Sequence, residues 1–134
     1  MSPADAVRSV LRSYARFSGR ARRSEYWWWS VAHTVVGTAW LVLGSLLVVA
    51  TGESEPVSIV VGLSYLVMLV GLLVPSIAVT VRRLHDVGRS GWWCLISLAP
   101  FGGIVLLVFT CMDSEPGPNA YGPWPKLPHR VTYA

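Results

Sequence analysis

The chain has 134 residues, the length of one domain, but its composition excludes an ordinary soluble one. Hydrophobic residues make up 53% of it and charged residues only 13%, whereas soluble domains carry about 25% charged residues. The formal net charge is +4. A water-exposed fold of this size cannot bury so much apolar surface. Because helices satisfy their own backbone hydrogen bonds in lipid, we expect an all-α integral membrane protein with a single membrane domain.

Residues 2–18 are expected to form an amphipathic helix that lies in the membrane interface. Ser2 can cap its N-terminus, and Pro3 suits the first helical position. Apolar side chains then recur at helical spacing, while arginines recur every four residues on another face. The arm is predicted either to fix the topology of the chain or to bind anionic lipid or an acidic partner.

Three apolar segments, residues 26–50, 57–81 and 91–112, are long enough to cross about 30 Å of hydrocarbon as helices. The third contains Pro100 near its middle, and the two halves are too short to span singly. We favour a third span that is broken at Pro100 and leaves the C-terminus outside, since neighbours can satisfy a backbone freed by proline. The alternative is a re-entrant hairpin that returns the turn-rich polar tail, residues 113–134, to the cytoplasm.

The distribution of basic residues predicts which side of the membrane each connection occupies. Six arginines precede the first span, the connection "TGESEP" has two glutamates and no basic residue, and the second connection contains three arginines. Cytoplasmic segments carry an excess of Lys and Arg. The N-terminus and the 82–91 loop should therefore be cytoplasmic, and Lys126 and Arg130 would favour a cytoplasmic tail.

Two stretches that enter apolar segments have the same pattern: "RRSEYWWW" from Arg22 and "GRSGWWC" from Gly88. In each, a serine can cap the following helix, and tryptophans can anchor the chain at headgroup depth. The predicted interfacial anchors are Trp27, Trp28, Trp92 and Trp93.

Basic side chains near these entries form the candidate binding site for a lipid headgroup, a phosphate or an acidic partner. Asp86 is spaced along the chain so that its carboxylate can bridge two guanidiniums, those of Arg82, Arg83 or Arg89. The candidate residues are Arg20, Arg22, Arg23, Arg82, Arg83, His85, Asp86 and Arg89.

Three functions are compatible with these patterns, and we favour a non-enzymatic membrane protein whose cytoplasmic Arg/Trp surface binds anionic lipid headgroups or a partner protein. The first alternative is a small oligomeric transporter or channel that uses the intramembrane His33 and the break at Pro100. The second is a membrane enzyme with His85 and Asp86 as acid and base.

The enzyme is the least favoured interpretation, because the sequence has no Gly-rich phosphate loop, no paired-carboxylate motif and no metal-ligand spacing. We therefore expect no catalytic residue, metal or cofactor, and no nucleic-acid partner. A homo-oligomer or a complex with another membrane protein is expected, since three short-looped spans bury little against one another.

Four blocks, "FSGRARRSEYWWW", "RRLHDVGRSGWW", "LAPFGG" and "PGPNAYGPWP", occur in this order between about residues 17 and 125. Together they resemble the bacterial domain of unknown function 805 family, whose members are small inner-membrane proteins. The resemblance implies a multi-pass protein of the bacterial inner (plasma) membrane and implies no activity. One position departs from the family pattern: Ala120 stands where relatives commonly have arginine, so a role for that arginine is not carried over.

Overall fold

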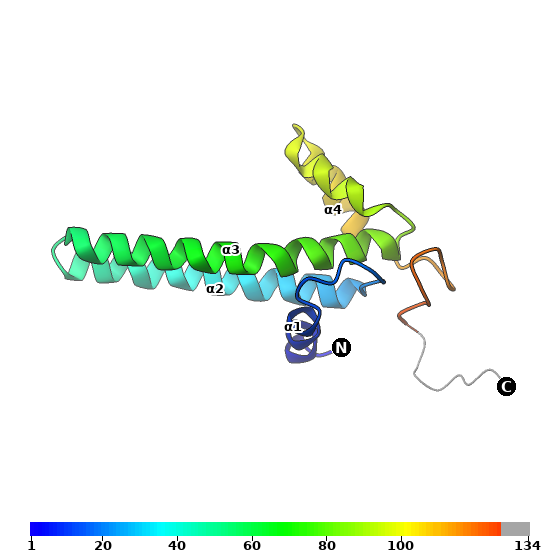
Figure 1. The fold of residues 1–134 in the computed structure, drawn as a ribbon, viewed down its shortest axis with the longest axis horizontal. Coiled ribbons are helices and arrows are strands. Elements are labelled where there is room, and N and C mark those ends of the chain that lie inside the picture. The colour runs from blue at the N-terminus through cyan, green and yellow to red at the C-terminus, as the bar shows by residue number, and fades with distance from the viewer. Residues whose placement is uncertain (127–134) are drawn as a thin grey trace.

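The computed structural model describes residues 1–126, which form helices joined by short connections (Figure 1). The elements in chain order are α1 (Pro3–Arg12), α2 (Arg23–Ala50), α3 (Glu55–Asp86), the 3₁₀ helix η1 (Gly91–Leu98) and α4 (Gly102–Cys111). Within the described residues, the one β contact is an isolated bridge between Asn119 and Gly122. The all-α prediction is therefore confirmed. The end of the predicted tail, residues 127–134 with Arg130, lies outside the described residues.

The helices α2 and α3 lie side by side as an antiparallel pair joined by residues 51–54, and they contain the predicted spans 26–50 and 57–81 (Figure 1). Both are long and apolar enough to cross a membrane. At 1.5 Å per residue they are about 42 and 48 Å long. The pair is closely packed at Gly44, where a Cβ atom would lie 2.6 Å from Val61 Cγ1.

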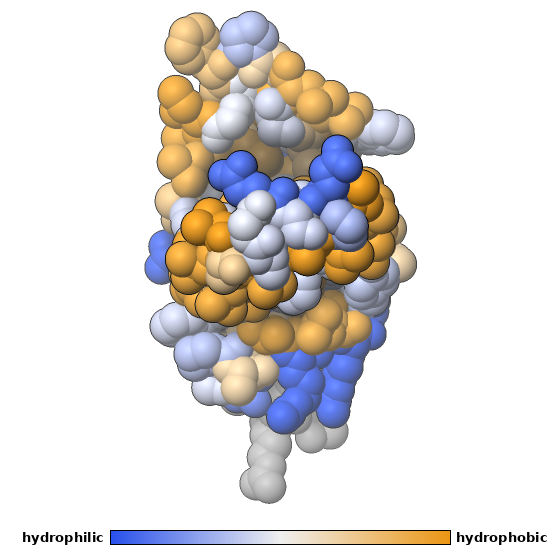
Figure 2. All heavy atoms as spheres, turned by 90° about the vertical axis from the view of Figure 1, so that its left-hand side faces the viewer, coloured by the Kyte–Doolittle hydropathy of each residue, from blue (hydrophilic) through white to orange (hydrophobic). Residues whose placement is uncertain are grey.

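Most of the outer surface of this helix pair is apolar and exposed. Figure 2 looks along the pair from its connecting loop and shows apolar residues around it, with hydrophilic residues at the loop and beneath the pair. An apolar surface of this extent is stable when hydrocarbon covers it, because water would be ordered around it. The fold thus requires the lipid environment that the composition predicts.

The helix α3 continues through Pro75, although proline has no N–H to donate to the carbonyl of Gly71. The hydroxyl of Tyr14 donates a hydrogen bond to that carbonyl. The segment that follows α1 therefore supplies the partner that proline removes, and this contact holds the N-terminal arm against the helix pair.

The N-terminal helix α1 begins as predicted, with the Ser2 side chain accepting a hydrogen bond from a first-turn N–H. It ends at Arg12 rather than at residue 18, because the following residues leave the helix and run toward α3. Val10 is fully buried and clusters with Trp29 of α2 and Val79 of α3. Figure 1 shows α1 nearly end on beside α2, so the axis of α1 crosses the axis of the pair.

Residues 91–112 do not continue in one direction as the favoured third span, broken at Pro100, would, because the chain reverses in their middle and forms a hairpin (Figure 1). The two arms are η1, with 8 residues, and α4, with 10 residues. They are about 16 and 15 Å long, half of the roughly 30 Å of a hydrocarbon core. The backbone therefore follows the path of the hairpin alternative, and the described tail starts near the end of α3, from which the hairpin leaves.

The reversal depends on two adjacent residues. Phe101 adopts the left-handed backbone conformation, with φ of 62°, directly after Pro100. At Gly102 the backbone passes so close to the Ile96 carbonyl that a Cβ atom would lie 1.6 Å from its oxygen. Only glycine fits this position, so the break predicted at Pro100 becomes a full change of direction.

Candidate functional site

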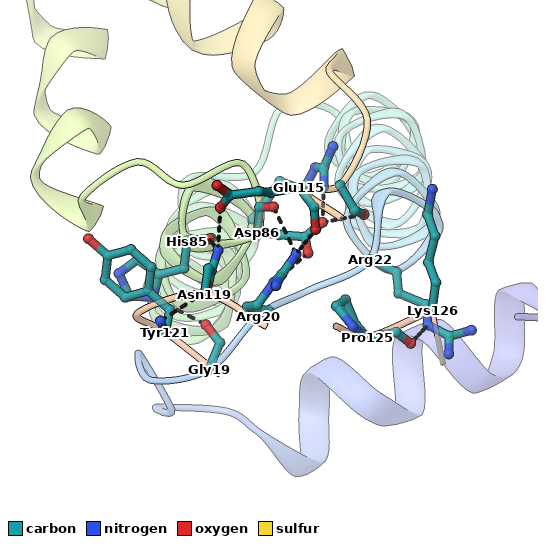
Figure 3. A network of polar contacts seen from close by, with 12 residues as sticks. Gly19, Arg20, Arg22, His85, Asp86, Glu115, Asn119, Tyr121, Pro125 and Lys126 are labelled. Carbon is teal, nitrogen blue, oxygen red and sulfur yellow. Dashed lines mark hydrogen bonds and ion pairs between the residues drawn. The ribbon is translucent and has the colours of Figure 1, made fainter. Parts of the chain in front are cut away.

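Three distant parts of the chain meet at one end of the helix pair, and Figure 3 shows their polar contacts. Because α2 and α3 are antiparallel, the start of α2 and the end of α3 lie at the same end, and the hairpin brings the tail there. The Ala21 N–H donates to the Arg82 carbonyl over 3.0 Å, and the Glu115 N–H donates to the Asp86 carbonyl over 2.9 Å. The candidate site is thus a junction between the N-terminal arm, the end of α3 and the tail.

The carboxylate of Asp86 lies at the centre of the junction and is completely buried. Its Oδ1 atom accepts a hydrogen bond from Arg20 Nε at 2.9 Å, and its Oδ2 atom accepts from Arg83 and from Ser114 Oγ, the latter at 2.6 Å. Asp86 therefore bridges two guanidiniums, as its spacing suggests, but the second belongs to Arg20. That residue lies 66 positions away in the sequence.

The two buried guanidiniums also donate to backbone carbonyls, Arg20 to those of the tail and Arg83 to those at the end of α4. Arg20 donates to the carbonyl of Gly117 at 2.7 Å and to that of Glu115 at 2.6 Å. Arg83 donates to the carbonyls of Thr110, at 3.2 Å, and Met112, at the C-terminal end of α4. The last carbonyls of a helix have no partner within it and carry a partial negative charge. Arg83 therefore supplies both the missing hydrogen-bond donors and a compensating positive charge.

A second buried ion pair connects the remaining helices. Arg82 of α3 donates from Nη1 to Glu25 of α2 at 2.9 Å, and both side chains are about 6% exposed. The same carboxylate oxygen accepts a hydrogen bond from Ser9 of α1 at 3.1 Å. The Nε and Nη2 atoms of Arg82 have no partner within the described chain. Glu25, which no sequence pattern singled out, therefore joins α1, α2 and α3 at one point.

The side chain of His85 connects the arm and the tail. Its ring stacks on Tyr121 with centroids 3.9 Å apart and planes 2° from parallel, and its Nδ1 atom lies 3.1 Å from the carbonyl of Gly19. The Asn119 amide donates to the backbone carbonyl of His85 at 2.9 Å. The tail turn thus covers one face of the imidazole, and a ring nitrogen is used in a backbone contact. The sequence placed Asn119 and Tyr121 in the turn-rich tail, but no sequence pattern predicted their contacts with His85.

The other basic residues lie toward the surface. The guanidinium of Arg89 lies 5.3 Å from the ring centroid of Phe109 of α4, and Arg22 donates from Nε to the carbonyl of Pro125. Arg23 is exposed and donates a hydrogen bond to the carbonyl of Cys111. Within the described residues, none of these three arginines forms an ion pair with a carboxylate.

An exposed ion pair lies farther along the tail, between Lys126 and Asp113. The hydrogen bond from Lys126, together with that from the Ser114 N–H, lowers the pKa of the Asp113 carboxyl. Lys126 is therefore neutralised locally, unlike the arginines of the surface.

The four predicted anchors, Trp27, Trp28, Trp92 and Trp93, are all exposed and lie in the second turn of α2 and the first turn of η1. Trp93 also packs edge-on against Phe109, with centroids 5.5 Å apart. The tryptophans therefore lie near the end of the helix pair that holds the buried arginines.

His33 lies on α2, more than two turns past the start of the helix, and is half-buried. Its Nδ1 atom is 2.9 Å from the carbonyl of Trp29, one turn earlier in the same helix. Pro100 is exposed at the tip of the hairpin. In the part of the chain that the structure describes, no group of three or more His, Cys, Asp or Glu side chains is arranged to hold a metal ion.

Comparison with known proteins gives these contacts a context. The model of the family described as "Protein of unknown function (DUF805)" matches residues 14–123, a range that contains the buried network and the hairpin. The chain belongs to this family. The prediction made from the four sequence blocks is therefore confirmed.

Two relatives from Escherichia coli (strain K12) carry the name inner membrane protein. The chain is 43% identical to inner membrane protein YhaI over 120 residues, which cover 89% of this chain and 93% of the relative. It is 39% identical to inner membrane protein YhaH over 121 residues, or 88% and 93% of the two chains. No solved structure shows a significant match. The names of these relatives, the shared family and two long apolar helices confirm the prediction of a transmembrane protein of the inner membrane.

Proposed function

We propose that the protein is a non-enzymatic, multi-pass membrane protein whose cytoplasmic end binds anionic lipid headgroups. The observation that carries the proposal is the division of its arginines into two groups. Each buried arginine forms an ion pair with a carboxylate, whereas the exposed ones form none within the described residues. The exposed group, called the basic surface below, consists of Arg8, Arg12, Arg16, Arg23 and Arg89.

In the proposed topology α2 and α3 cross the bilayer, α1 lies in the interface, and residues 91–112 re-enter from the cytoplasmic side. The excess of arginine at one end of the pair and the two glutamates near the connecting loop support this orientation. The angle between α1 and the helix pair also supports it, because a helix that crosses a spanning pair runs along the membrane plane. The N-terminus, the 82–91 loop and the described tail then share the cytoplasmic side.

The buried network supports the basic surface instead of contacting lipid in this proposal. Arg20, Arg82, Arg83 and Asp86 hold the arm, the hairpin and the tail in place, and their side chains are at most about 6% exposed. The basic surface supplies the headgroup contacts. Each basic residue near an anionic leaflet contributes about 1 kcal/mol, so five of them provide several kcal/mol, and the tryptophans fix the depth.

Lipid selectivity of the purified full-length protein tests the proposal. We would replace Arg16, Arg23 and Arg89 together by glutamine and measure, by native mass spectrometry, the bound phosphatidylglycerol relative to phosphatidylcholine. The expected result is a clear loss of preference for phosphatidylglycerol at low salt, because three phosphate-facing charges are absent. The matched control is Lys126→Gln, whose charge is already paired with Asp113 and whose loss should change little.

Equal selectivity of the wild type and the triple variant would contradict the proposal. If an acidic protein co-purifies with the wild type and is lost from the triple variant, while lipid selectivity is unchanged, the basic surface binds a protein partner and the lipid proposal fails.

A further inference from the structure

A groove lies between α1 and the first half of α2. Its volume is about 850 Å³, within the roughly 300–1,000 Å³ that is typical of sites for small organic ligands. Among the described residues, eleven line it, and they lie within Pro3–Arg12 of α1 and within residues 28–36 of α2.

We propose that this groove is a binding site for one anionic glycerophospholipid, with an acyl chain between the helices and the phosphate on Arg8 and Arg12. This inference rests on the proposed function and assigns one lipid molecule to a defined place. The lining, the position of the two arginines and the direction of the groove support it.

The lining favours a hydrocarbon chain over a hydrated solute. Nine of the eleven side chains are apolar or aromatic, and the lining contains no acidic residue. Leu11, Val31, Val35 and Val36 are each about half exposed or more, so the groove offers unpaired apolar surface. Polar solutes would lose hydration there without gaining hydrogen bonds, whereas an acyl chain gains apolar contact.

The two arginines give the groove a charged end. Arg8 and Arg12 are four residues apart on α1, so they lie on the same face of the helix one turn apart. Both are exposed, and neither forms an ion pair within the described residues. Guanidiniums bind phosphate oxygens through paired hydrogen bonds, so two adjacent arginines suit a phosphodiester with negative charge.

The groove also has the direction that a membrane lipid needs. On α2 its lining begins at Trp28, near the basic end, and continues to Val36, eight residues or about 12 Å farther along the helix. Because α2 is a candidate membrane span, this direction leads from headgroup depth into the hydrocarbon. A lipid with its phosphate at α1 would therefore place its chain along α2.

Affinity measurements with the full-length protein in detergent test this site. The probes are dioctanoyl phosphatidylglycerol, dioctanoyl phosphatidylcholine and inorganic phosphate, and binding is counted by native mass spectrometry. We expect selective binding of one phosphatidylglycerol that inorganic phosphate does not displace. The Arg8→Gln/Arg12→Gln variant should bind about thirtyfold more weakly, from about 1 kcal/mol per basic residue.

A groove-filling variant separates this site from general attraction to the basic surface. Ala32→Trp should abolish the selective binding while all charges remain. Its matched control is Ala39→Trp, two turns farther along α2 and outside the groove, which should bind as the wild type does.

Wild-type affinity in both Ala32→Trp and the double arginine variant would overturn the groove site, as would displacement by inorganic phosphate. The broader proposal survives that result if the Arg16, Arg23 and Arg89 triple variant still loses its selectivity for phosphatidylglycerol.

Discussion

The buried carboxylate of Asp86 should contribute more to stability than any other acidic group in the described chain, and Asp86→Asn tests this. The substitution keeps the size of the side chain but removes the charge that faces Arg20 and Arg83. Asparagine retains one acceptor oxygen, and its NH₂ group would point at a cationic or hydroxyl donor. At least one hydrogen bond to a charged group, about 1.5–3 kcal/mol, is therefore lost.

The larger effect is electrostatic, because two buried guanidiniums would share no counterion. Removing one partner of a buried pair costs about 3–5 kcal/mol, and we expect Asp86→Asn to fall in or above that range. For a chain of this size the melting temperature should fall by about 10 °C or more. Since the Glu115 N–H donates to the Asp86 carbonyl, hydrogen exchange in the tail should accelerate as well.

Thermal unfolding in detergent and hydrogen exchange of residues 113–126 measure both effects. Asp113→Asn is the matched control, since its ion pair is exposed and exposed pairs contribute about 0–1 kcal/mol. If Asp86→Asn melts within about 2–3 °C of the wild type with unchanged exchange in the tail, the network does not hold the tail as described.

Two further substitutions test the hairpin and the arm. Gly102→Ala should destabilise the hairpin and expose it to protease, because the new Cβ would meet the Ile96 carbonyl oxygen. The control Gly103→Ala should be tolerated, since the space around Gly103 is open. Equal protease resistance of the two variants would refute the tight reversal. Tyr14→Phe should lower the free energy of unfolding by about 1–3 kcal/mol, because the Gly71 carbonyl loses its donor. An unchanged melting temperature in detergent would contradict this contact.

Local rules predicted some of the helix ends. Gly88 follows α3 with φ of 71°, the left-handed position that favours glycine after a helix. Ser90 caps η1 by accepting from the Trp92 N–H. The matching prediction for Ser24 was wrong, because α2 starts at Arg23 and Ser24 lies inside its first turn. A capping residue can be recognised from sequence, but the turn at which a helix starts depends also on tertiary contacts.

The sequence predicted most residues of the candidate site but not which of them contact one another. Spacing along one helix indicated the Arg83–Asp86 pair, but no local rule connects Arg20 to a carboxylate 66 residues away. The sequence pattern also could not predict the burial of Arg20, Arg83 and Asp86, because their burial depends on the return of the tail. That return follows from the reversal at Phe101, a non-glycine residue in a left-handed conformation, which sequence rules rarely anticipate.

The side of the membrane on which the C-terminus lies tests the central claim most directly. The arm, the 82–91 loop and the tail form one junction, so they must lie on the same side of the membrane. Fusions of green fluorescent protein and of alkaline phosphatase to the C-terminus report that side. We predict a fluorescent fusion and an inactive phosphatase, the result for a cytoplasmic C-terminus. An active phosphatase would place the C-terminus outside the cytoplasm and would contradict a cytoplasmic junction of the arm, the 82–91 loop and the tail.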